Sequence, residues 1–260
     1  MQRNAHSNLK FSLTLVGTLK RYIREHIFPV PIKEKDVVTA YDLWAANYDA
    51  QPGNLMLYLD QQIFNRLLNT DLVKNRQVAD IGCGTGRHWP KILNKHPLRL
   101  TGFDVSPGML NKLREKYPVA QTNLITDNLF SAIETGTFDT IISTLTIAHI
   151  ENMEAALKAW SRILKAKGDI IITDFHPDTL ASGGKRTFRH QNTQIAVRNF
   201  VHPVARIRQV LFNKGFSVVA EEEIIVDEQV KHYYGEQNAL HVYEKFKGSP
   251  IIYGLHFRRG

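Results

Sequence analysis

The chain has 260 residues, of which 43% are hydrophobic and 22% are charged, so it is long enough to bury one substantial core and has a globular composition. Its single cysteine, Cys83, excludes an internal disulfide framework and a cysteine-rich zinc site, which makes the cytoplasm the expected location. The formal charge of +8 is compatible with an anionic substrate, a nucleic acid, a membrane surface or merely a solvated basic arm, since residues 1–35 hold seven Lys/Arg against two Asp/Glu.

An apolar run near the N-terminus, over residues 11–30, is interrupted by Lys20, Arg21, Arg24 and Glu25. No small-residue cleavage site follows a clean apolar core, so we expect neither a signal peptide nor a membrane span. Residues 1–50 are predicted to form an N-terminal arm and cap. Residues 51–260 are predicted to form the main domain.

The next predicted element is an amphipathic helix, with one apolar side made of Leu55, Leu59, Ile63, Leu67 and Leu68. From residue 77 onward, short β-type runs alternate with helical stretches, which is the pattern of a parallel sheet covered by helices on both faces. The first five runs span residues 77–81, 98–104, 120–126, 138–143 and 169–174.

Between the last two runs a helix is predicted from an apolar stripe, formed by Met153, Ala156, Leu157, Trp160, Ile163 and Leu164. Residues 165–168 are expected to end it. A further helix over residues 203–213 precedes two more β-type runs, 216–226 and 250–258. The irregular stretches 175–200 and 227–248 are too long for ordinary connectors, so each is predicted to be a cap insertion.

A glycine-rich loop, residues 80–86, follows the first apolar strand and opens a helical stretch. Its glycines permit a tight turn and the close approach of a ligand to the backbone. A dinucleotide fingerprint would place its third glycine at position 87, where this chain has Arg87, and Asp80 precedes the glycines. The loop therefore predicts a bound ligand other than NAD.

Residues 78–87 resemble the cofactor loop of class I S-adenosylmethionine-dependent methyltransferases. In that family the acid at the strand end and the glycine backbone hold the methionine part of the cofactor, so the resemblance implies that Asp80, Gly82, Cys83 and Gly84 line the site. It also implies the fold, an α/β, Rossmann-like, seven-stranded mixed sheet. This sheet is expected to be mostly parallel, with an antiparallel last strand and helices on both faces.

Asp104 ends the next strand, 24 residues after Asp80, and its carboxylate is placed to accept both hydroxyls of a ribose. The alternative is that Asp104 caps the helix opened by Ser106 and Pro107. The resemblance further implies that Val105 and Met109 contact the adenine ring.

The third predicted strand ends at residues 126–129, where the family usually binds the adenine amino group with an acid. Asp127, with Asn128 and Leu129, is the candidate here, and a turn residue is the alternative. Residues 138–143 match the family's next strand, so Ser143 joins the cofactor set, and residues 164–169 resemble its turn into the fifth. The resemblance covers about residues 77–174.

The segment 41–49 resembles the N-terminal segment of small-molecule methyltransferases related to ubiquinone and menaquinone biosynthesis enzymes. There a tyrosine reaches the cofactor carboxylate. Tyr41 or Tyr48 is implied in this role, with simple packing as the alternative.

Methyl transfer from a sulfonium is an in-line displacement, and a base is needed only when the acceptor loses a proton. His149 follows the fourth strand and His176 the fifth, so both are expected at the carboxyl edge of the sheet as candidate bases. His202 is a third candidate. For each, packing or surface exposure is the alternative.

Two classes of acceptor are disfavoured. Enzymes that methylate exocyclic amino groups of nucleobases typically carry Asn/Asp-Pro-Pro-Tyr/Phe after the fourth strand, where residues 143–146 read Ser-Thr-Leu-Thr. Cytosine C5 methylation needs a thiolate nucleophile, and Cys83 lies in the cofactor loop.

Two groups of residues are candidates for the acceptor site. In the loop 183–188, Lys185 and Arg186 follow two glycines and are placed to close over an anionic acceptor, with a plain surface loop as the alternative. A second group, placed to wall an aromatic acceptor, consists of His232, Tyr233, Tyr234 and His241.

The sequence thus predicts an enzyme that uses S-adenosylmethionine to methylate a small organic molecule, with O-methylation favoured over C- or N-methylation of a lipophilic or quinone-type acceptor. An RNA or protein methyltransferase and a non-catalytic cofactor-binding regulatory subunit are the alternatives. No metal site is expected and nucleic acid is disfavoured as a partner. Peripheral membrane contact stays open, and the chain is expected to be a monomer or homodimer.

Overall fold

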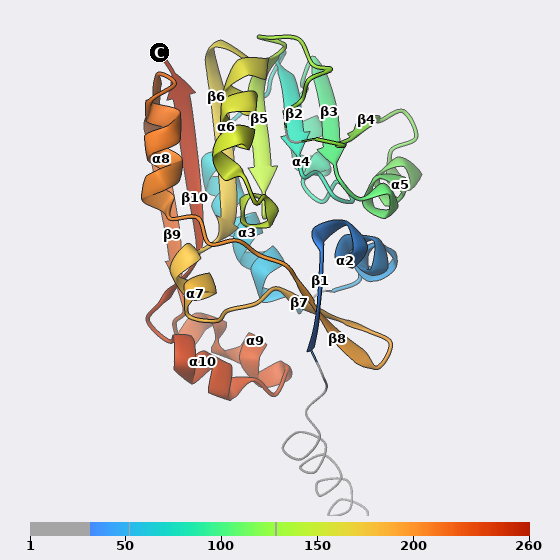
Figure 1. Ribbon diagram of the computed structural model, residues 1–260, viewed down its shortest axis with the longest axis vertical. Coiled ribbons are helices and arrows are strands. Elements are labelled where there is room, and N and C mark those ends of the chain that lie inside the picture. The colour runs from blue at the N-terminus through green and yellow to red at the C-terminus, as the bar shows by residue number, and fades with distance from the viewer. Residues whose placement is uncertain (1–31, 52, 128) are drawn as a thin grey trace, which may run out of the picture.

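The computed structural model describes residues 32–51, 53–127 and 129–260, and a seven-stranded sheet is its main element (Figure 1). The strand order is β4-β3-β2-β5-β6-β10-β9. The strands are β2 (Gln77–Ile81), β3 (Arg99–Asp104), β4 (Gln121–Leu124), β5 (Phe138–Thr144), β6 (Leu164–Phe175), β9 (Phe216–Ile225) and β10 (Pro250–Arg259). Neighbours from β4 to β6 are parallel, and β10 is antiparallel to both β6 and β9, which confirms the predicted mixed sheet with an antiparallel last strand.

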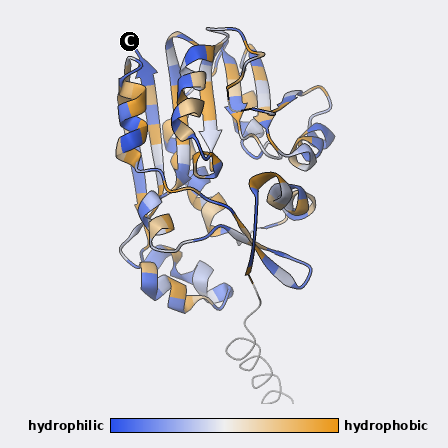
Figure 2. Cartoon of the chain, in the orientation of Figure 1, coloured by the Kyte–Doolittle hydropathy of each residue, from blue (hydrophilic) through white to orange (hydrophobic). Residues whose placement is uncertain are grey.

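Helices cover both faces of the sheet, as predicted (Figure 1). One face packs against α3 (Leu55–Leu67), α4 (Trp89–Leu93) and α5 (Pro107–Lys116), and the other against α6 (Met153–Ile163) and α8 (Val204–Phe212). Because side chains alternate along a strand, Ile171 of β6 joins the α3 cluster while Ile170 and Ile172 join the α6 and α8 cluster. Figure 2 shows hydrophobic and hydrophilic residues side by side on the covering helices.

Gly254 lets α3 approach the sheet closely. It lies on β10, and a Cβ at this position would overlap Ile63 and lie 2.8 Å from Leu67, both on α3. The missing side chain therefore sets the distance between the two layers.

Two local predictions were wrong. Helix α6 ends at Ile163, but residues 165–168, expected to be its terminating turn, already belong to β6. They form an irregularity in the strand, because Phe138 pairs with Leu164 whereas Thr140 pairs with Asp169. The predicted third strand, residues 120–126, is shortened to β4, whose side chains are mostly exposed.

The stretches expected to be irregular contain regular structure. Residues 175–200 hold α7 (Pro177–Ala181), β7 (Thr187–His190) and β8 (Thr193–Val197). Residues 227–248 hold the 3-10 turn η3 (Glu228–Val230) and the helices α9 (Lys231–Glu236) and α10 (Leu240–Phe246). Each element is too short to show a clear hydrophobic period.

The N-terminal cap consists of β1 (Ile32–Lys35), α2 (Val37–Trp44) and the 3-10 turn η1 (Ala45–Asn47). Strand β1 pairs in parallel with β8, which forms a hairpin with β7, so a small second sheet joins the two cap segments. Trp44 stacks on Phe188 of this sheet, with ring centres 4.4 Å apart. Figure 1 shows α2 beneath the carboxyl ends of β2 and β3.

The first 31 residues of the predicted arm lie outside the described residues. Within the described part of the chain, no helix is both long and apolar enough to cross a membrane.

Candidate functional site

The glycine loop after β2 adopts a backbone that requires glycine. Gly82, Gly84 and Gly86 have φ angles of 75°, 53° and 75°, in the left-handed region. The amides of Gly82 and Cys83 both donate to the carbonyl of Phe103, at 2.7 and 3.0 Å. The loop is therefore held against the end of β3.

A cavity of about 780 Å³ opens beside this loop, at the carboxyl edge of the parallel strands. We call it the first cavity. Eight predicted site residues line it: Tyr41, Tyr48, Gly82, Gly84, Asp104, Val105, Met109 and His149. Its further lining includes Val37, Ile125, Thr146 and Ile150, which the sequence did not single out because nothing local distinguishes them from core residues.

Asp104 presents a buried carboxylate at this cavity. Its Oδ2 accepts a hydrogen bond from the Gly84 amide at 2.7 Å, and its Oδ1 accepts one from the Ser106 amide at 2.9 Å. Burial raises the pKa of Asp104 to about 6. The N-cap of α5 is Ser106, which accepts from the amide of Met109 at 3.1 Å, so capping is not the role of Asp104.

Three predicted residues lie behind the cavity wall. Asp80 is buried and accepts a hydrogen bond from Nε1 of Trp89 at 2.8 Å, and burial raises its pKa to about 7. Cys83 is buried against Gly102, and burial raises the pKa of its thiol. Ser143 is buried within β5. None of these three residues lines the cavity.

The predicted adenine acid is not brought to the cavity. Asp127 and Leu129 are exposed, and the carboxylate of Asp127 accepts the amide of Leu129 at 2.7 Å, as a turn residue does. Asn128 lies outside the described residues. Ile125, two residues earlier in the chain than Asp127, lines the cavity instead.

Two carboxylates of the N-terminal cap tie it to the glycine loop and to the start of α5. Asp42 accepts from the Ser106 hydroxyl at 2.5 Å and from the Gly108 amide at 2.9 Å. Asp49 accepts from the Thr85 hydroxyl at 2.7 Å. Sequence reasoning missed both, because their partners, at the start of α5 and on the glycine loop, come near only in the folded chain.

Tyr41 and His149 form a polar pair in the cavity. The Tyr41 hydroxyl lies 2.9 Å from Nε2 of His149, and Nδ1 lies 3.0 Å from the carbonyl oxygen of Arg198. A carbonyl only accepts, so Nδ1 carries the proton and Nε2 presents its lone pair to Tyr41. Burial, assisted by the charge of Arg186, lowers the pKa of His149 to about 4. The ring is therefore neutral near pH 7.

The other two candidate histidines lie elsewhere. His176 is the N-cap of α7, where Nδ1 accepts from the Asp178 amide at 3.2 Å. His202 donates from Nε2 to the carbonyl of Ile150 at 2.7 Å. Neither lines the first cavity, so the tertiary structure leaves His149 as the candidate base.

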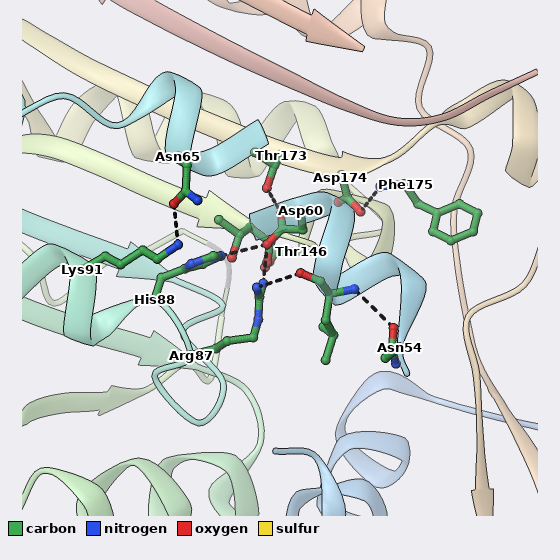
Figure 3. A network of polar contacts seen from close by, with 12 residues as sticks. Asn54, Asp60, Asn65, Arg87, His88, Lys91, Thr146, Thr173, Asp174 and Phe175 are labelled. Atoms are coloured by element: carbon green, nitrogen blue, oxygen red, sulfur yellow. Dashed lines mark hydrogen bonds and ion pairs between the residues drawn. The ribbon is translucent and has the colours of Figure 1, made fainter. Parts of the chain in front are cut away.

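A buried ionic network lies beneath the loop (Figure 3). Asp60 of α3 is fully buried and accepts hydrogen bonds from Arg87, from His88 at 2.8 Å and from Thr173 of β6. Burial acts to raise the pKa of Asp60, but the charge of Arg87 and the hydrogen bonds from His88 and Thr173 together outweigh it, and the pKa is lowered. Arg87, which argued against a dinucleotide fingerprint, thus anchors the loop to α3, and Asp60 continues the network to β6.

Comparisons with known proteins agree with this architecture. Residues 79–172 match the family model of a methyltransferase domain. The chain is 27% identical over 154 residues to a ubiquinone/menaquinone biosynthesis C-methyltransferase of Campylobacter jejuni, covering 55% of this chain and 65% of the relative. It is 30% identical over 165 residues to a phosphoethanolamine N-methyltransferase of Triticum aestivum, covering 58% of this chain and 30% of the relative.

Among solved structures, the fold resembles a putative S-adenosylmethionine dependent methyltransferase from Listeria monocytogenes, with a TM-score of 0.61 and 17% identity. That match covers 78% of this chain and 99% of the other. The matched segment spans just under two thirds of the Campylobacter jejuni relative. Residues 79–172 are therefore a methyltransferase domain on a Rossmann-like sheet, as the sequence predicted.

Proposed function

We propose that this chain, with its methyltransferase domain over residues 79–172, is an enzyme that transfers the methyl group of S-adenosylmethionine to a hydroxyl of a small organic molecule. One observation carries the proposal. The glycine loop, Asp104 and the Tyr41–His149 pair all line a single cavity at the carboxyl edge of the sheet. Open α/β sheets bind their ligands at this edge.

The lining of the first cavity fits this cofactor. A Cβ on Gly84 would meet no atom within 4 Å, so the glycine backbone leaves room for the methionine part. The carboxylate of Asp104 suits the two ribose hydroxyls. Val105, Met109 and Ile125 offer apolar contacts for the adenine ring.

When bound, the cofactor would supply a methyl group on a sulfonium, open to in-line attack at the methyl carbon, with neutral S-adenosylhomocysteine as the leaving group. The protein aligns the two partners and excludes water. A hydroxyl acceptor also loses a proton, and Nε2 of His149 is the group that receives it. The lowered pKa keeps this nitrogen unprotonated at neutral pH, and the hydrogen bond from Nδ1 to Arg198 fixes the ring. Tyr41 either relays the proton or yields its place to the acceptor hydroxyl.

C- or N-methylation of a lipophilic acceptor is the alternative within the same class, and the names of the two relatives support it. Methylation with a ¹³C-labelled methyl donor distinguishes these chemistries, because the chemical shift of the methyl carbon in the product identifies the atom to which it is bonded. A methyl on carbon or nitrogen in the product of the preferred acceptor rejects O-methylation.

Calorimetric titration with S-adenosylhomocysteine, run beside NADH, tests the cofactor assignment first. Micromolar binding of the former alone supports it, and binding of NADH alone contradicts it. Appearance of S-adenosylhomocysteine on incubation with S-adenosylmethionine and any acceptor of a panel then rejects a non-catalytic cofactor-binding role.

A further inference from the structure

A second cavity, also of about 780 Å³, lies under the cap. Its walls come from the start of α3, the turn from α7 into β7, and the helices α9 and α10. Apolar side chains make much of this surface, among them Trp44, Phe175, Phe246 and Ile251. Of the aromatic residues that the sequence suggested as acceptor walls, Tyr234 lines this cavity.

Arg186 is the buried charge of this second cavity. Its exposed fraction is 6%, and its guanidinium carbon lies 5.4 Å from the ring centre of Trp44 and 5.8 Å from that of Tyr41. Nη2 donates to the Tyr48 hydroxyl at 3.1 Å, but Nε has no hydrogen-bond partner. Within the described residues Arg186 forms no ion pair. Asp174 acts on Arg186 through its charge alone, and a buried cation without a hydrogen-bonded counter-charge is costly, so the site favours an anionic ligand.

The backbone fixes Arg186 in this position. The amide of Gly184 donates to the carbonyl of Thr179 at 2.8 Å, and a Cβ on Gly184 would lie 2.7 Å from that oxygen. The carbonyl of Arg186 accepts from the Val197 amide at 3.0 Å, inside the small second sheet. The arginine is therefore built into the cavity wall, unlike its exposed neighbour Lys185.

We propose that the second cavity is the acceptor pocket, and that it takes an organic acid with an apolar body whose carboxylate pairs with Arg186. The planar guanidinium carries its donors in the fork geometry that a carboxylate accepts, and its unpartnered Nε leaves part of this hydrogen-bonding capacity unused. Tyr48, which Arg186 contacts, lines the first cavity, so the two cavities share a wall. The assignment of this pocket to the acceptor rests on the proposed function.

The test uses the full chain, first titrated with S-adenosylhomocysteine and then, in its presence, with 4-phenylbutyrate and its neutral amide. A second acid–amide pair, decanoate and decanamide, is titrated in the same way. Phenyl phosphate tests whether a phosphate is preferred to a carboxylate. Calorimetry reports binding, and tryptophan fluorescence, to which Trp44 contributes, gives a second signal. We expect each carboxylate to bind at least about tenfold more tightly than its amide, because only the carboxylate neutralises Arg186. Equal affinities, no binding at millimolar concentration, or preference for the phosphate would overturn the proposal.

Arg186→Gln should remove the difference between acid and amide, whereas Arg189→Gln, at an exposed arginine of β7, should retain it. If Arg186→Gln still binds the acid more tightly than the amide, the proposal is rejected. If this variant does not fold, the comparison of acid and amide in the unmodified chain tests the proposal. If S-adenosylhomocysteine binds but the acid and its amide bind equally well, only the acceptor pocket is rejected. If the acid binds more tightly than its amide but S-adenosylhomocysteine does not bind, the proposed function is rejected and the carboxylate site remains.

Discussion

Tyr41 and His149, which lie 108 positions apart in the chain, meet across 2.9 Å in the first cavity. The hydroxyl belongs to the N-terminal cap and the imidazole to the loop after β5, so this hydrogen bond closes the cap over the sheet edge. Tyr41 is the donor in this hydrogen bond, because the proton of the His149 ring lies on Nδ1, which donates to the carbonyl of Arg198. The pair is both a structural tie and the proposed route for a proton.

His149→Gln should slow turnover on a hydroxyl acceptor by about 10²–10⁴, because the base for the acceptor proton is lost. The affinity for S-adenosylhomocysteine should change little. Steady-state kinetics and calorimetry on the same preparation separate the two effects. His202→Gln, at a histidine outside the cavity, is the matched control and should keep its turnover. Full activity of His149→Gln would remove this residue as the base.

Cofactor affinity should depend on pH through Asp104. The ionised carboxylate accepts the ribose hydroxyls, and its pKa in the free protein is raised to about 6. Affinity for S-adenosylhomocysteine should therefore be constant well above pH 6, begin to fall near pH 6, and approach a tenfold loss for each pH unit below it, as protonation competes with binding. Calorimetric titrations from pH 5 to pH 8 measure this dependence.

Substitution of Asp104 tests whether this residue causes the pH dependence of cofactor affinity. Asp104→Asn should bind weakly at every pH and lose the pH dependence, and Asp104→Ala should cost about 1–3 kcal/mol of binding free energy through lost charged hydrogen bonds. A pH dependence that survives in Asp104→Asn would assign it to another group.

Alanine substitutions at Gly82 and Gly84 should separate effects on stability from effects on cofactor binding. Gly82→Ala combines a left-handed φ with an overlap of its Cβ and the side chain of Thr146, so it should destabilise the fold by at least about 1–3 kcal/mol. A Cβ on Gly84 meets open space in the first cavity, so Gly84→Ala should cost only about 1 kcal/mol of stability.

Cofactor binding should be affected strongly by the substitution at Gly84, even though that substitution costs little stability. Gly84→Ala places a methyl group where the cofactor is proposed to lie, so a stably folded protein should no longer bind S-adenosylhomocysteine. Thermal unfolding and calorimetry on the two variants measure both properties. Unimpaired binding by Gly84→Ala would displace the cofactor from this part of the loop.

Removal of Arg87 should leave a buried charge uncompensated. Arg87→Met strips Asp60 of its cationic partner, and we expect a loss of about 3–5 kcal/mol in the free energy of unfolding, measured with urea. Lys112→Met, which breaks an exposed pair with Glu115, is the control and should cost about 0–1 kcal/mol. A cost for Arg87→Met no larger than for Lys112→Met would show that Asp60 does not depend on this partner.

The sequence by itself determined the sheet, the covering helices and the glycine loop. These features depend on local rules, namely the two-residue period of strands, the helical period of apolar residues and the left-handed φ of Gly82 and Gly84. Asp104 was placed correctly at the cavity because the carboxyl ends of parallel strands share one edge.

Only the tertiary structure decided which polar groups meet. Asp42 with Ser106, Tyr41 with His149, and Tyr48 with Arg186 are separated by 64, 108 and 138 positions, and no local pattern specifies such partners. His176 and His202 lie outside the first cavity, although His176 follows a strand end just as His149 does. Local sterics fix the elements, whereas the choice among distant side chains follows from how the cap packs on the sheet.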